Sequence, residues 1–158
     1  MSICLIDTSV FVNILDIPGK NQQKQQILDE LEKKIGQDWQ LLLPMATIIE
    51  TGNHIAQCGD GRIRRTCAKK FIEQVRGAFD GVAPWSPTAF PTIEEIGTYL
   101  SEFPDYAMRG KNGSSGIGFG DFTIIKEWKK ICKQNPLREI LIWSLDGDLL
   151  GYHQPTSC

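Results

Sequence analysis

Acidic residues follow two apolar segments that are typical of buried strands. Asp7 comes directly after the apolar residues 3–6, and Asp146 stands just behind the apolar stretch 139–145. The carboxyl ends of parallel strands meet at one edge of a sheet, so the two aspartates are expected to lie close together there. Carboxylates at such an edge can bind a metal ion, provided that further acids reach the same place.

Three more acidic residues are candidates for that site: Glu50, Asp121 and Asp148. Two carboxylates about 4 Å apart repel each other by roughly 4 kcal/mol at an effective dielectric constant near 20. Four or five of them would therefore take up protons or bind a cation. Oxygen ligands alone favour Mg²⁺ or Mn²⁺ over zinc, and one or two such ions can activate a water molecule and hold a phosphate. The acids thus predict phosphodiester hydrolysis by metal-activated water.

Each acid also has a local structural interpretation. Asp7 and Asp121 are both favourable at the start of a helix. In the segment TIIE, Thr47 and Glu50 are spaced as a capping box. Asp148 lies in the sequence DGD, which is typical of a turn. Because capping and metal binding can coexist, these alternatives stay open at this point.

Four short motifs, in this order, resemble those of the PIN-domain family of metal-dependent ribonucleases. The motifs are LIDTSVF, TIIETGN, GFGDFTII and WSLDGDL, and together they cover nearly the whole chain. The last one departs from the family pattern because Ser144 stands where threonine is usual.

The resemblance implies roles for individual residues. Asp7, Glu50, Asp121 and Asp146 would be the catalytic, metal-binding acids, and Asp148 an additional or outer acid. The supporting hydroxyl groups would belong to Thr8 or Ser9 beside the first aspartate and to Ser144 at the last strand end. The family also implies an RNA substrate, one or two Mg²⁺ or Mn²⁺ ions, a homodimer, and an antitoxin or other regulatory protein as partner.

The elements expected around these acids alternate between strands and helices. Strands are predicted at 2–6, 38–44 and 139–145, with at most a short edge strand in 82–91; helices are predicted just after Asp7 and at 21–35, 46–57, 61–79, 92–103 and 122–134. This alternation predicts one domain over 1–158, a three-layer α/β/α sandwich with a mostly parallel sheet. The glycine-rich segment 110–120 is expected to be a loop beside the cleft, and the residues around His153 a loosely ordered tail.

Substrate-binding candidates lie on two of the predicted helices. Asn53 and His54 follow Glu50 by three and four residues and share its helix face. On the helix 61–79 a basic stripe faces away from the apolar positions and is suited to RNA phosphates, although an ordinary solvated face is the favoured explanation. Arg64 projects among the apolar positions and either extends to the surface or points at the cleft. The basic candidates are Arg62, Arg64, Arg65 and Lys69.

Composition excludes several other classes of protein. A formal net charge of −2 rules out a generic polycation, and 23% charged residues beside 41% hydrophobic ones are typical of a folded domain. No apolar run approaches the roughly 20 residues of a membrane span, and the N-terminus does not resemble a secretory signal. The five cysteines show no paired spacing, which favours reduced thiols in a cytoplasmic protein.

Two rival functions are considered. A phosphatase with an aspartyl nucleophile needs the pattern D-x-D after the first strand, but Asp7 is followed by Thr8 and Ser9. A catalytically silent PIN-like module that binds RNA or a partner protein would keep the fold without using the acids. Stabilisation of the fold by Mn²⁺ would distinguish the nuclease from this module.

Overall fold

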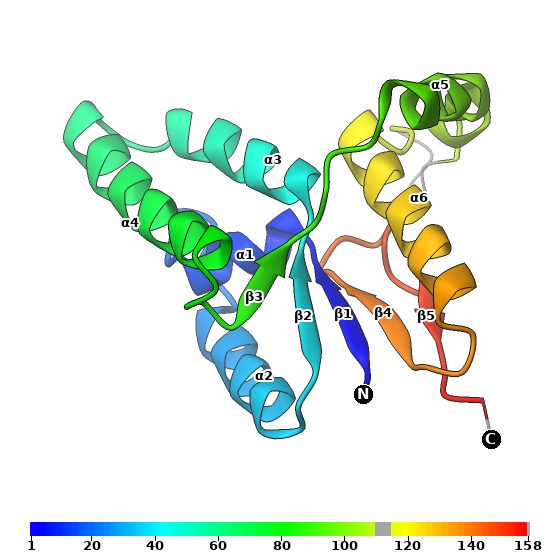
Figure 1. Ribbon diagram of the computed structural model, residues 1–158. Coiled ribbons are helices and arrows are strands. Elements are labelled where there is room, and N and C mark those ends of the chain that lie inside the picture. Colours follow the sequence, from blue (N-terminus) through cyan, green and yellow to red (C-terminus); the bar gives the residue numbers. More distant parts are fainter. Residues whose placement is uncertain (110–114, 158) are drawn as a thin grey trace.

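A five-stranded sheet forms the centre of the computed structural model, which describes residues 1–109 and 115–157. The strand order is β3-β2-β1-β4-β5, and only β5 runs antiparallel to its neighbour (Figure 1). The strands are β1 (Ile3–Ile6), β2 (Gln40–Leu43), β3 (Trp85–Pro87), β4 (Ile140–Trp143) and β5 (His153–Gln154). The prediction of a mostly parallel sheet with a short edge strand is confirmed.

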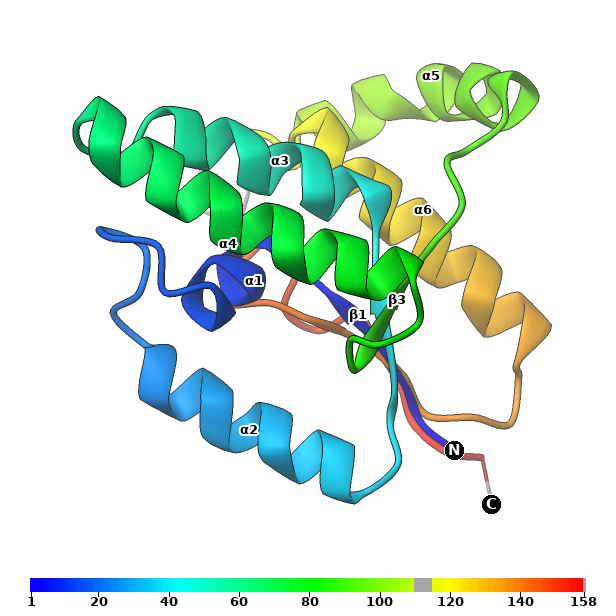
Figure 2. The same ribbon diagram turned by 60° about the vertical axis from the view of Figure 1, so that its left-hand side comes forward.

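Helices cover both faces of this sheet. They are α1 (Thr8–Ile14), α2 (Lys24–Gly36), α3 (Met45–Ala56), α4 (Gly61–Phe79), α5 (Ile93–Ala107) and α6 (Phe119–Gln134). In Figure 1, α1, α2 and α4 lie on one side and α5 and α6 on the other, while α3 runs beside α4 in both ribbon views (Figure 2). The molecule is thus the three-layer α/β/α sandwich that the alternation predicts.

Strand β1 separates two hydrophobic clusters because its side chains alternate between the two faces of the sheet. Cys4 and Ile6 belong to the cluster under α1–α4, whereas Ile3 and Leu5 belong to the cluster under α5 and α6. Burial on both faces explains why the strand is apolar at every position. In this way the core fixes the end of β1 and the position of Asp7, which follows it.

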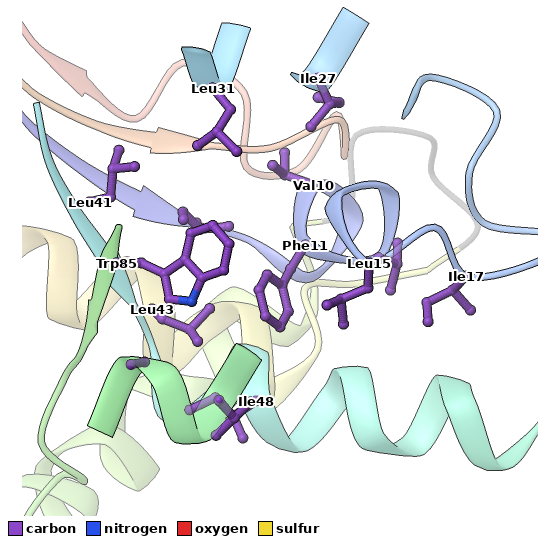
Figure 3. Packing of buried hydrophobic residues seen from close by; sticks show 14 of the residues in the cluster. Val10, Phe11, Leu15, Ile17, Ile27, Leu31, Leu41, Leu43, Ile48 and Trp85 are labelled. Atoms are coloured by element: carbon purple, nitrogen blue, oxygen red, sulfur yellow. The ribbon is translucent and has the colours of Figure 1, made fainter. Parts of the chain in front are cut away.

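The first cluster is closed at the sheet edge by an aromatic pair. Phe11 of α1 and Trp85 of β3 meet edge to face, with ring centroids 5.6 Å apart and an interplanar angle of 88° (Figure 3). Both rings are buried. This contact holds the first turn of α1 against the sheet, directly behind the end of β1.

Three helix boundaries differ from those predicted by three or more residues. Helix α2 begins at Lys24, three residues later than predicted. Helix α5 continues through the exposed Pro104 to Ala107, because Tyr106 beyond it is buried against Phe122 with ring centroids 4.7 Å apart. Helix α6 begins at Phe119, three residues earlier than predicted, so Asp121 is its third residue.

The expectation of a loose tail is wrong. His153 lies in β5, which pairs with β4, and its Nε2 atom lies 2.9 Å from Oε1 of Glu139. Two residues are too short for a recognisable strand pattern, so pairing with β4 decides this element. Of the predicted glycine-rich loop, residues 110–114 lie outside the described residues.

Candidate functional site

Parallel pairing brings the first and last acidic motifs to the same edge of the sheet. Strands β1 and β4 are neighbours with Ile6 opposite Trp143, and the Asp7 amide donates to the Trp143 carbonyl oxygen at 3.0 Å. Both arrows point to this edge in Figure 1. Asp7 and Ser144 therefore stand side by side although 137 positions separate them in the sequence.

Two serine hydroxyl groups fix the carboxylate of Asp7. Its Oδ2 atom accepts hydrogen bonds from Ser9 Oγ at 2.7 Å and from Ser144 Oγ at 2.8 Å. Ser9 Oγ in turn accepts from the amide of Leu145, and Ser144 Oγ from that of Asp146, both at 2.9 Å. The same two hydroxyl groups thus orient the carboxylate and hold the turn that carries Asp146.

The second carboxylate oxygen of Asp7 makes no such contact. The residue is 3% exposed, and its Oδ1 atom is buried without a hydrogen-bond partner among the described residues. Asp7 is also the N-cap of α1, accepting from the Ser9 amide at 3.4 Å, so capping uses only the other oxygen. An unpaired buried anionic oxygen is costly, and a bound cation would remove that cost.

Glu50 is not used as a helix cap. The N-cap of α3 is Pro44, and Thr47 instead donates its hydroxyl hydrogen to the Ile6 carbonyl oxygen at 2.8 Å. The capping-box alternative is therefore wrong, because Thr47 bonds to the sheet. The exposed Glu50 side chain approaches α6: a Cβ atom on Gly120 would lie 3.3 Å from Glu50 Oε2. A glycine at this position leaves room for the carboxylate.

The pKa of Asp121 is raised by burial and by the negative charges of the other four acids. Burial is the largest cause that raises its pKa to about 7 from 3.8, followed by the negative charges of Asp7, Asp146, Glu50 and Asp148 in that order. Repulsion among nearby carboxylates has this direction because it disfavours the ionised form. Four distant segments of the chain thus place mutually repelling charges close together.

Four acids line one cleft of about 300 Å³ at the carboxyl edge of the sheet: Asp7, Glu50, Asp121 and Asp146. Among residues 1–109 and 115–157, no three acidic, histidine or cysteine side chains are grouped closely enough to hold a metal ion. The acids surround the cleft without meeting at one point. Their oxygen-only chemistry and the unpaired Asp7 Oδ1 atom nevertheless fit Mg²⁺ or Mn²⁺.

The cleft also contains residues that no sequence motif indicates. Lys20 and Gln22, from the segment between α1 and α2, also line it. This segment is held by Asn13, which donates to the Ser9 carbonyl oxygen at 2.8 Å and accepts from the Gln23 amide at 3.0 Å. Only the path of the chain brings Lys20 here, so no local signal could have found it.

Asp148 does not line the cleft that the other four acids line. It lines a neighbouring cavity with Arg109 and Tyr152, and its amide donates to Asp146 Oδ1 at 2.9 Å. This is the turn geometry that the sequence DGD predicts. Its negative charge still raises the pKa of Asp121, and this effect is the smallest of those exerted by the four neighbouring acids.

The substrate-binding candidates take different positions. His54 lines the cleft, whereas the exposed Asn53 does not. Of the two alternatives for Arg64, the structure does not adopt the one in which it points at the cleft: its Nη1 atom donates to the carbonyl oxygens of Gly59 at 2.7 Å and Cys58 at 3.4 Å, just beyond the end of α3. The remaining basic candidates are exposed on α4: Arg62, Arg65 and Lys69.

The described cysteines are unpaired, as the sequence predicts. Cys4, Cys58, Cys67 and Cys132 are free thiols, and none of them lines the cleft. In the described part of the chain, no helix combines the length and apolar character that crossing a membrane requires.

Comparison with known proteins supports the fold. No protein-family model matches the chain, and no curated protein matches it in sequence. Two similar solved structures are FitAcB from Neisseria gonorrhoeae (19% identity, 94% of this chain and 92% of that chain, TM-score 0.55) and FitAB bound to an IR36 DNA fragment (18% identity, 94% and 89%, TM-score 0.58). The likeness covers most of the chain, which therefore shares the α/β fold of these two structures.

Proposed function

We propose that this protein is a Mg²⁺- or Mn²⁺-dependent endoribonuclease that hydrolyses RNA phosphodiester bonds. One observation carries the proposal: four carboxylates from distant segments line a single cleft at the carboxyl edge of a parallel sheet. Ligands bind at this edge in open α/β folds. The raised pKa of Asp121 supports the proposal: burial is its largest cause, and the negative charges of the other acids, which a cation would neutralise, add to it.

In this proposal the metal-holding residues are Asp7, Glu50, Asp121 and Asp146. When bound, one or two ions would supply an activated water and offset negative charge on the phosphate. The protein's own contribution is to position the acids. Ser9 and Ser144 fix Asp7 with Oδ1 left for a cation, and the exposed Glu50 keeps the rotational freedom to join it.

Polar residues around the acids would bind the substrate. Lys20 can pair with a phosphate oxygen, and Gln22 and His54 can hydrogen-bond to phosphate or ribose, since all three line the cleft. The net charge of the chain is −2, so such local contacts matter more than the overall field. The exposed arginines and lysine of α4 would contribute at most a more distant contact to the RNA backbone.

We also propose that the protein is the toxin of a toxin–antitoxin pair, acting as a homodimer with an antitoxin as its regulatory partner. This rests on the PIN-like fold and on the likeness to FitAB, one structure of which is bound to DNA. Exposed apolar side chains on α5 offer a surface for protein contact: Ile93 is 93% exposed and Leu100 is 59% exposed.

The direct test is RNA cleavage by the purified protein. Structured and unstructured RNAs are incubated with Mg²⁺, Mn²⁺ or a chelator, and the Asp146→Asn protein is the control for contaminating nuclease. Cleavage is expected only with metal and only in the wild type. Cleavage that persists in chelator or in Asp146→Asn would contradict the proposal.

A catalytically silent module that binds RNA or a partner protein is the second candidate. It is favoured by the absence, in the described part of the chain, of a preformed group of three metal ligands. Thermal melting with increasing Mn²⁺ distinguishes the two. The nuclease proposal predicts a melting temperature that rises with Mn²⁺ concentration, whereas the silent module predicts a constant one.

A further inference from the structure

A second pocket of about 280 Å³ opens beside the carboxylate cleft. It lies between α3, the segment 89–91 and the first turns of α6. Its walls are mostly apolar, with three polar side chains among them, those of Glu50, Thr123 and Glu127. The residues that matter for its chemistry are Met45, Phe90, Phe119, Thr123 and Glu127.

The pocket and the carboxylate cleft share a wall. Glu50 lines both of them, and Gly120 lies against the same carboxylate. In RNA, a base is joined to the neighbouring phosphate through a single sugar. A phosphate held by the acids would therefore bring the base of an adjacent nucleotide to this pocket.

We propose that this pocket binds an unpaired nucleobase of the substrate and so selects the nucleotide beside the scissile bond. The proposal takes its substrate class from the proposed ribonuclease function. A base is a flat, largely apolar ring with hydrogen-bonding groups at its edge. The pocket matches this description, with aromatic walls and a carboxylate among them.

The aromatic walls form a stacking surface. Phe90 is 59% exposed although it is a large apolar side chain. Phe119 is backed by Phe103, with ring centroids 5.1 Å apart and an interplanar angle of 88°, and by Phe122 at 5.9 Å. One wall is thus held in place by the core and the other is accessible. Stacking of a base on an aromatic ring contributes about 1–3 kcal/mol.

Glu127 supplies hydrogen-bonding capacity. No cationic side chain in the described part of the chain forms an ion pair with it. Burial raises the pKa of its carboxyl group, an effect that the Thr88 hydroxyl partly offsets. A carboxylate accepts hydrogen bonds from amino and imino groups.

Guanine offers two such donors side by side at its Watson–Crick edge. Adenine and cytosine offer one amino group each, and uracil offers one imino group. The carboxylate of Glu127 therefore predicts that guanine binds best.

The test uses nucleosides and the metal-free protein. Guanosine, adenosine, cytidine and uridine are titrated separately into the labelled wild type, and backbone amide shifts are followed by NMR. Nucleosides carry no phosphate and no metal ion is present, so binding does not depend on metal-assisted phosphate binding in the carboxylate cleft. We expect shifts at the pocket residues Phe90, Phe119, Gly120, Thr123 and Glu127, with guanosine binding most tightly.

Three variants identify the contacts. Phe90→Ala, at an exposed position, should weaken guanosine binding about five-fold or more, because it removes one stacking wall. Glu127→Gln should reduce the preference for guanosine over uridine while keeping the pocket's shape. Phe79→Ala is the matched control: Phe79 is 56% exposed at the end of α4, outside the pocket, so binding should not change.

The outcomes separate this proposal from the nuclease proposal. Pocket shifts without RNA cleavage would support the base pocket and refute the nuclease. RNA cleavage without pocket shifts, at millimolar nucleoside, would overturn the base pocket and leave the nuclease standing. If the pocket amides respond only to protein concentration, and Phe90→Ala turns a dimer into a monomer, a second copy covers the pocket and the proposal is overturned.

Discussion

Replacing Asp121 by asparagine removes the carboxyl group whose pKa is raised by burial and by the negative charges of the other acids. The side chain keeps its size and its place in the first turn of α6. Because folding raises the pKa of Asp121 from 3.8 to about 7, its ionised form opposes folding in the metal-free protein. The wild-type free energy of unfolding should therefore fall as the pH rises from about 4 to about 7, and stay level above that.

The expected size follows from the same pKa. A change from 3.8 to about 7 corresponds to about 4 kcal/mol at about 1.4 kcal/mol per pH unit. Asp121 is only partly buried, so solvent screening reduces this to about 2 kcal/mol. The variant also loses a favourable anion at the helix N-terminus, which reduces the gain in stability by about 0.3–1 kcal/mol. The Asp121→Asn protein should thus be more stable by about 1–2 kcal/mol above pH 7.

The assay is thermal or urea unfolding in chelator, from pH 4 to pH 8.5. For a chain of this size, 1–2 kcal/mol corresponds to an increase of about 2–8 °C in melting temperature. The difference between the two proteins should shrink toward zero near pH 4, where both carry a neutral side chain. Adding Mn²⁺ should stabilise the wild type more than the variant.

Asp105→Asn is the matched control, since it removes the same charge from an exposed position on α5. It should not reproduce the pH dependence. If Asp121→Asn is less stable than the wild type throughout this range, Asp121 acts as a helix-stabilising residue, and burial and the neighbouring acids do not oppose its ionisation as inferred. Equal stabilisation by both variants would point to the overall charge instead of the cleft.

Other predictions test the surroundings of the acids. Ser144→Ala should destabilise the fold by about 1–2 kcal/mol in urea unfolding and weaken the Mn²⁺ response, because it removes the hydroxyl group that orients Asp7, whereas Ser144→Thr should preserve both. Gly120→Ala should stabilise the helix by up to about 1 kcal/mol. It should nevertheless reduce RNA cleavage, because the added Cβ atom would press on Glu50 Oε2. Unchanged cleavage would show that this contact does not matter for the reaction. Arg64→Ala should cost about 1 kcal/mol without altering the Mn²⁺ response, and a changed response would mean that its role extends to the cleft.

Local patterns in the sequence were sufficient for the architecture. Apolar runs identify β1, β2 and β4, and the helical spacing of apolar residues identifies α2 and α4. These signals arise from burial, which repeats with the period of each element. They also place Asp7 and Asp146 at one edge of the sheet, because parallel strands that follow this alternation end on the same side.

Contacts between distant residues decided the rest. The spacing of Thr47 and Glu50 permits a capping box, but the Thr47 hydroxyl bonds to the Ile6 carbonyl oxygen, 41 residues away. Lys20 enters the cleft and His153 joins the sheet only through the path of the chain. Patterns in the sequence report on neighbours along the chain, and not on the distant partners that folding brings close. The sequence by itself therefore determined which acids face the edge of the sheet, and only the tertiary structure decided what surrounds them.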